Sequence, residues 1–119
     1  MQIISFKDLI VWQKAMILTE ESYKIASELP HSEMFGLVSQ IKRSAISIPS
    51  NIAEGHKRGS KDFIRFLKVS YGSAAELETQ LLLCQKLFPA VSISKALDLV
   101  VEIEKMTSTI ITKLESEKH

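Results

Sequence analysis

The chain has 119 residues and a formal net charge of +1; 45% of its residues are apolar, whereas eight are aromatic, four are glycine and three are proline. This length suits one domain with one hydrophobic core, and the scarcity of aromatic and turn-forming residues favours helices over a turn-rich sheet. The single cysteine, Cys84, excludes an intrachain disulfide, and neither a secretory signal nor the roughly 20-residue apolar stretch of a membrane helix is evident, so we expect a soluble, cytoplasmic, all-α domain over residues 1–119.

The first predicted helix covers about residues 6–29, because apolar residues recur there every three or four positions. These residues form two adjoining stripes rather than one. Since a helix that packs against one neighbour needs only a narrow stripe, we expect this helix to be buried against more than one partner, either within the bundle or across a subunit interface. One stripe contains Leu9, Trp12, Met16, Tyr23 and Ala26, and the other contains Val11, Ala15, Leu18, Ile25 and Leu29.

A second helix is predicted over about residues 32–55, with Ser32 as its N-cap. Pro49 interrupts this segment and removes the hydrogen bond to the Ala45 carbonyl. We expect a kink at Pro49 rather than a helix end, because Ile52 keeps the helical phase of the preceding core residues, and we expect Ser44 or Ser47 to satisfy the freed carbonyl. The predicted core face is Met34, Val38, Ile41, Ala45, Ile48 and Ile52.

Gly55 and Gly59 predict a polar break, after which Ser60 is a plausible N-cap for a third helix over about residues 60–88. Small residues from Gly72 to Ala75 would let a neighbouring helix approach closely. A fourth helix is predicted over about residues 93–115, and the short connections make neighbouring helices antiparallel in an up-and-down bundle. The core faces of these two helices are Phe63, Leu67, Ser70, Ala74, Leu77, Leu81, Cys84 and Phe88, then Ile93, Ala96, Val100, Ile103, Thr107, Ile110 and Leu114.

The sequence does not contain the usual residue sets for catalysis or cofactor binding. A di-metal bundle site needs Glu-x-x-His pairs, and the one match, Glu28 to His31, spans Pro30 at a helix end. Cys84 falls on the apolar face of the third helix, where it is expected to be a small buried hydrophobe rather than a nucleophile. We therefore expect a non-catalytic protein with no metal, no cofactor and no small-molecule substrate.

Charge is distributed unevenly along the chain. The segment 42–68 carries a net charge of +5, and the rest carries −4. A basic surface of this kind can contact nucleic-acid phosphates, and since no aromatic residue is assigned to it, we expect backbone contacts without base stacking. The alternative is a solvated helix end whose charges form salt bridges within or between subunits. The candidate nucleic-acid-binding residues are Arg43, Lys57, Arg58, Lys61, Arg65 and Lys68.

A second polar set contains Glu54 and Glu76. Because helices two and three should be neighbours, we expect Glu54 or Glu76 to pair with Arg43 and to fix the orientation of the two helices. The weaker alternative is a catalytic acid–base pair, which would require Glu54, Glu76 and His56 to meet in one pocket.

Several motifs resemble one known family. They are the opening Leu9-x-x-Trp12-Gln13-Lys14-Ala15, the run Ser-Ile-Pro-Ser-Asn-Ile-Ala-Glu-Gly over residues 47–55, and the run Gly-Ser-Ala-Ala-Glu-Leu-Glu over residues 72–78. They are similar to the four-helix-bundle proteins encoded within intervening sequences of bacterial 23S rRNA genes, also described as S23 ribosomal protein-like. The resemblance covers about residues 6–88. The residues taken as its structural motif are Pro49, Asn51, Glu54, Gly55, Gly72, Ser73 and Glu76.

The resemblance implies a homo-oligomer, with a pentamer as the expected form, and no established enzymatic activity. It also implies rRNA or another nucleic acid as a candidate partner. The accessory proteins of diversity-generating retroelements look like a related branch of this family, built as basic barrels that engage a reverse transcriptase and nucleic acid. Tyr71 stands where the family pattern predicts Arg, which removes one positive charge. The alternative function is a protein-interaction adaptor that makes no direct RNA contact.

Overall fold

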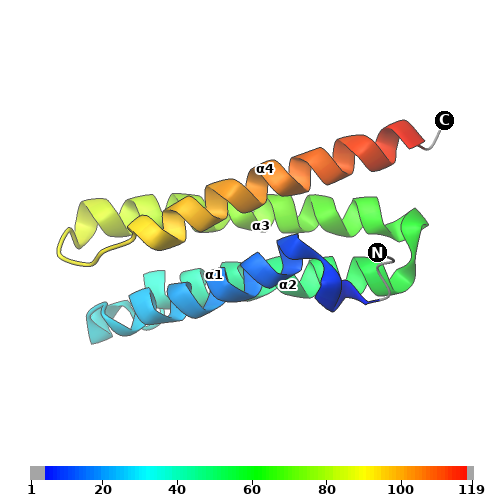
Figure 1. Cartoon of the computed structure of the whole chain (residues 1–119). Coiled ribbons are helices and arrows are strands. Elements are labelled where there is room, and N and C mark those ends of the chain that lie inside the picture. The colour runs from blue at the N-terminus through cyan, green and yellow to red at the C-terminus, as the bar shows by residue number, and fades with distance from the viewer. Residues whose placement is uncertain (1–4, 118–119) are drawn as a thin grey trace.

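The computed structural model describes residues 5–117, which form four long helices and two short 3-10 turns (Figure 1). No strand is present in this range, and the predicted all-α four-helix bundle is confirmed. None of the helices in the described range has the length and hydropathy of a membrane span. The elements are η1 Phe6–Asp8, α1 Ile10–Ser27, η2 His31–Glu33, α2 Leu37–Arg58, α3 Ser60–Leu87 and α4 Ser94–Glu117.

The four helices lie alongside one another in a body of 49 × 24 × 21 Å, and Figure 1 shows successive helices pointing in opposite directions. Each helix contacts two others: α1 and α3 each lie against both α2 and α4. The contact between α2 and α3 is the most extensive of these. The α2–α3 hairpin is therefore the part of the fold in which close packing matters most.

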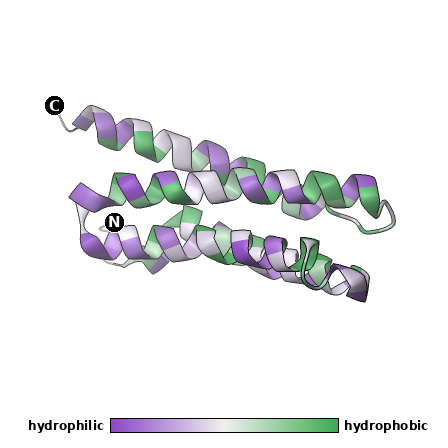
Figure 2. Ribbon diagram, turned by 180° about the vertical axis from the view of Figure 1, so that it is seen from behind, coloured by the Kyte–Doolittle hydropathy of each residue, from purple (hydrophilic) through white to green (hydrophobic). Residues whose placement is uncertain are grey.

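The predicted core faces of α2, α3 and α4 are largely buried. In α2, Ile41, Ala45, Ile48 and Ile52 are all fully buried. Met34 is an exception with 42% of its surface exposed, because it lies in the turn before α2 rather than within the helix. Figure 2 shows the expected alternation of apolar and polar residues along the helices, with strongly polar residues at the α2–α3 turn.

The two apolar stripes of α1 have different environments. Val11, Ala15 and Leu18 of the second stripe are buried in the core. In the first stripe, however, Met16 and Tyr23 are 41% and 39% exposed. Contact with both α2 and α4 buries one stripe completely, and part of the other stripe remains on the surface beside α2.

The start of α2 differs from the prediction. Ser32 lies in the 3-10 turn His31–Glu33 and does not cap α2, whose N-cap is Gly36. The Glu33 carboxylate instead accepts a hydrogen bond from the Leu37 backbone N–H at 3.4 Å. Pro30 begins the tight 3-10 turn, so the long helix starts five residues later than expected. At the start of α3, Ser60 is likewise the first helical residue rather than the N-cap.

The predicted polar break at Gly55 is wrong. Gly55 is buried within α2, which continues to Arg58, and the break before α3 is Gly59 alone. Gly59 has a φ of +103°, a conformation that side chains other than glycine rarely adopt. At Gly55 the reason is space, since an added Cβ would lie 2.6 Å from the Cβ of Phe66 in α3. One glycine therefore permits close helix packing, and the other permits the turn.

α2 continues through Pro49 as one helix, and the bend expected at this residue stays a prediction. The carbonyl freed by Pro49 is that of Ala45. Neither Ser44 nor Ser47 satisfies it: the hydroxyl of Thr19, in α1, lies 3.1 Å from the Ala45 oxygen and 2.9 Å from the Ala15 oxygen. A neighbouring helix therefore supplies the donor that proline lacks.

Thr19→Val is expected to lower the free energy of unfolding by about 1 kcal/mol, because valine leaves the Ala45 carbonyl without a donor. Urea denaturation at a constant protein concentration measures this change. In a Pro49→Ala background the backbone N–H of residue 49 can bond to Ala45, so the same substitution should cost clearly less there. An equal cost in both backgrounds would assign the role of Thr19 to packing alone.

Candidate functional site

The α2–α3 hairpin brings five of the six candidate basic residues to one end of the bundle. Lys57 and Arg58 lie in the last turn of α2, and the other three follow in the first turns of α3. Arg43 is not part of this group, because it lies 15 residues before Arg58 in α2, about 22 Å along the helix axis. We call the remaining set the basic surface: Lys57, Arg58, Lys61, Arg65 and Lys68.

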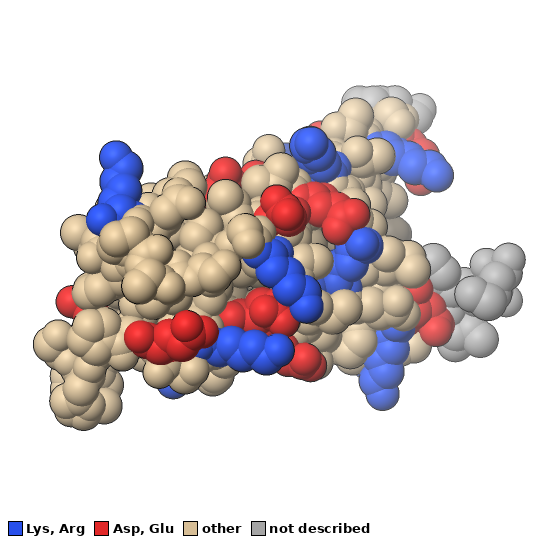
Figure 3. Space-filling view, turned by 60° about the vertical axis from the view of Figure 1, so that its left-hand side comes forward, with Lys and Arg blue, Asp and Glu red and all other residues tan. Residues whose placement is uncertain are grey.

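Acidic side chains neutralise much of the basic surface. Arg58 pairs with Glu54 at 2.9 Å. Arg65 approaches Asp62 at 3.6 Å. Lys68 pairs with Glu115 of α4 at 3.0 Å. Within residues 5–117, Lys57 and Lys61 form no ion pair. Positive and negative side chains are also interspersed on the face of the bundle that Figure 3 shows, which is turned toward the opposite end.

Phe66 is an aromatic residue of this surface that the sequence interpretation missed. The guanidinium carbon of Arg58 lies 5.1 Å from the centroid of its ring, and that of Arg65 lies 4.6 Å away. Both distances are typical of a cation–π contact. The sequence did carry a signal, because Phe66 directly follows Arg65. The two arginines are thus held by both an acid and a ring, which leaves Lys57 and Lys61 as the more available charges.

The expected pairing of Arg43 with Glu54 or Glu76 is not formed within residues 5–117. The Glu54 carboxylate bonds to Arg58 in its own helix instead, one turn away. Glu76 is exposed on α3. From the contact between Ser47 and Ser73, Glu54 and Glu76 lie in opposite directions along the bundle, about 15 Å apart in axial position. The two carboxylates therefore do not converge with His56 on one pocket.

Two of the other motif residues, Asn51 and Ser73, stabilise the α2–α3 contact through Ser47. The Asn51 amide donates hydrogen bonds to the carbonyl and hydroxyl oxygens of Ser47, and the hydroxyls of Ser47 and Ser73 lie 2.8 Å apart. Pro49 is buried in the same helix. Gly72 differs from these residues, because it faces open space and no atom lies within 4 Å of an added Cβ. Of the small residues predicted to allow close helix approach, Ser73 and Ala74 are therefore buried, whereas Gly72 itself does not serve packing within this chain.

An apolar groove runs along α1 and α2 on the surface. Phe6 and Trp12, which both line it, meet edge to face with ring centroids 5.3 Å apart. Met16 and Ile46 remain 41% and 44% exposed beside them. We call this feature the α1–α2 groove, lined by Phe6, Trp12, Met16, Thr19, Ile46, Pro49, Ser50 and Ala53.

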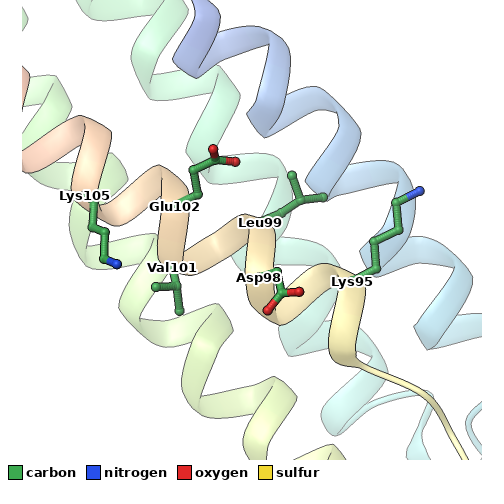
Figure 4. A pocket seen from close by; sticks show the side chains of 6 residues that line it. All are labelled: Lys95, Asp98, Leu99, Val101, Glu102 and Lys105. Atoms are coloured by element: carbon green, nitrogen blue, oxygen red, sulfur yellow. The ribbon is translucent and has the colours of Figure 1, made fainter.

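A hollow on the surface of α4 is lined by this one helix, unlike the α1–α2 groove. All six of its lining residues, shown in Figure 4, come from α4. Glu102 points to α1, where it pairs with Lys14 at 2.9 Å, while Val101 and Lys105 point to the α3 side. Within residues 5–117 no group of three or more His, Cys, Asp or Glu side chains has the arrangement of a metal site.

Cys84 is buried in the core, as the sequence predicted. Its burial raises the pKa of the thiol, which disfavours the nucleophilic thiolate.

Comparison with known proteins places the chain in a family. The model of the 23S rRNA-intervening sequence protein family matches residues 7–109. The chain belongs to this family. No curated protein matches it.

A solved structure of a family relative is also similar to the chain. It is the crystal structure of a protein with unknown function from the S23 ribosomal protein family of Bacteroides thetaiotaomicron VPI-5482. The identity is 26%, the TM-score is 0.74, and the match covers 86% of this chain and 98% of that chain. The match extends beyond the motifs to most of the bundle.

Proposed function

We propose that the protein is a non-catalytic, homo-oligomeric scaffold of the 23S rRNA intervening-sequence type. The observation that carries this proposal is the α1–α2 groove, in which Trp12, Met16 and Ile46 present apolar surface to the solvent. Exposed apolar patches of soluble proteins are typical of interaction sites, and copies of one chain most often assemble by closed symmetry. In such an assembly, the exposed part of the first apolar stripe of α1 is buried against a second copy of the chain.

Light scattering combined with size-exclusion chromatography tests this proposal on the wild-type chain. The 13.4-kDa chain should elute at a multiple of its mass at micromolar concentration, and a pentamer is the form that the family suggests. A monomer at every concentration up to the millimolar range would refute self-assembly.

Nucleic-acid binding through the basic surface is the second candidate function. Its support is the pair of lysines, Lys57 and Lys61, that are exposed and unpaired within the described range, together with the rRNA context in the family name. The ion pairs of Arg58, Arg65 and Lys68 weaken this candidate, because bound phosphates would have to compete with Glu54, Asp62 and Glu115.

A salt titration of RNA binding separates this candidate from an adaptor without RNA contact. If the basic surface binds phosphates, the affinity should fall steeply with added salt and should fall again in a Lys57→Glu, Lys61→Glu double variant. Arg43→Glu is the matched control outside the surface and should bind like the wild type. No binding by the wild type would favour the adaptor, and equal loss in all variants would place the RNA contact outside the basic surface.

A further inference from the structure

A carboxyl pair between α3 and α4 has no role in the fold or in the functions considered so far. Glu78 of α3 and Glu104 of α4 are both partly buried. One oxygen of Glu104, Oε2, is fully buried and has no hydrogen-bond donor within the described range. The Lys68–Glu115 ion pair fixes the register of the antiparallel helices α3 and α4, and this register brings Glu78 level with Glu104 and its neighbour. A buried acceptor without a donor is costly, and two ionised carboxylates at this position cannot satisfy one another.

A single proton removes this conflict. A protonated carboxyl group donates one O–H hydrogen bond and still accepts others, so a proton shared by the two carboxyls provides the missing donor. Paired carboxyl groups in proteins commonly behave in this way. We infer that Glu78 and Glu104 form a proton-sharing carboxyl pair that tightens the α3–α4 contact when it holds a proton and loosens it when both groups are ionised.

The surroundings of the pair contain little that would neutralise it. On the α4 side, Lys105 lines a small hollow with Tyr71 and Glu104, and it forms no ion pair within residues 5–117. The opposite flank of α4 meets α1, where Lys14 is engaged by Glu102. α2 does not contact α4. The groups facing Glu104 are therefore Glu78 and Tyr71 from α3 and Lys105 from its own helix.

The electrostatics agree with this geometry. Burial, followed by the hydrogen bond and the negative charge of Glu78, raises the pKa of Glu104 from its ordinary value of 4.5 to about 7. The unfolded chain releases this proton near pH 4.5, whereas the folded chain keeps it until about pH 7. Stability should therefore fall as the pH rises between these two values and should remain constant above them, as far as this pair is concerned.

Thermal unfolding between pH 4.5 and pH 8.5 tests the inference on the full chain. The wild type should lose stability across this range, and Glu104→Gln should flatten the loss and raise Tm at pH 8 by about 5 °C. Glu78→Gln should act in the same direction. Glu76→Gln is the matched control: it makes the same chemical change two positions away on the exposed side of α3, and it should keep the slope of the wild type.

A second measurement needs no variant. Carbon-13 NMR of the glutamate side-chain carboxyls should show one group of the wild-type protein that titrates near pH 7. Amide exchange, after correction for its intrinsic pH dependence, should show higher protection factors in α4 below that pH than above it. If every glutamate titrates below pH 5.5, or if Glu104→Gln keeps the wild-type pH slope, the pair does not share a proton.

Discussion

Gly55→Ala is expected to lower the free energy of unfolding by about 1–3 kcal/mol, although alanine is the better helix former. The added methyl carbon would lie 2.6 Å from the Phe66 Cβ and 3.2 Å from a ring carbon of Phe63. The first of these atoms is fixed to the backbone of α3, so relief requires the two helices to move apart. This movement would disturb the most extensive helix contact of the bundle. Chemical denaturation at a constant protein concentration measures the loss.

Gly72→Ala is the matched control for this prediction. Gly72 is also helical, but an added Cβ there meets no atom within 4 Å. The same substitution should therefore stabilise the protein by about 0.5–1 kcal/mol, through helix propensity alone. Equal and favourable effects at both positions would show that α2 and α3 are not tightly packed at Gly55.

Met16→Glu is expected to convert the oligomer into a monomer. In a monomer this side chain is already 41% exposed, so a charge there should leave the fold intact. In the proposed assembly it would be buried in the α1–α2 groove against another copy, where an unpaired carboxylate is costly by several kcal/mol. Light scattering measures the mass, and circular dichroism checks the helical content.

Ile17→Glu provides the control for the groove. Ile17 is 45% exposed, and it neighbours Met16 in α1 but does not line the groove. This variant should keep the mass of the wild-type assembly. Dissociation by both variants would place the interface elsewhere on α1, and dissociation by neither would exclude the groove as an interface.

Much of the candidate basic surface was visible in the sequence, whereas its electrostatic state was not. Lys57, Arg58 and Lys61 are close in the chain, so a hairpin necessarily gathers them. Glu115, by contrast, is almost fifty residues from its partner Lys68, and only the packing of α4 on α3 brings the two together. A charge count along the chain therefore overstates the charge that is free to bind a phosphate.

Periodicity alone determined the helical class, the four main segments and most of the core. An α-helix has 3.6 residues per turn, so the apolar residues of its buried face recur every three or four positions in the sequence. Tertiary structure decided the features that depend on a second helix. Phe66 makes Gly55 a packing residue rather than a break, and Thr19 of α1 satisfies the carbonyl freed by Pro49. The opposition of Glu78 and Glu104 likewise arises between helices. Such contacts depend on how the helices are placed relative to one another, which the pattern within any one helix does not specify.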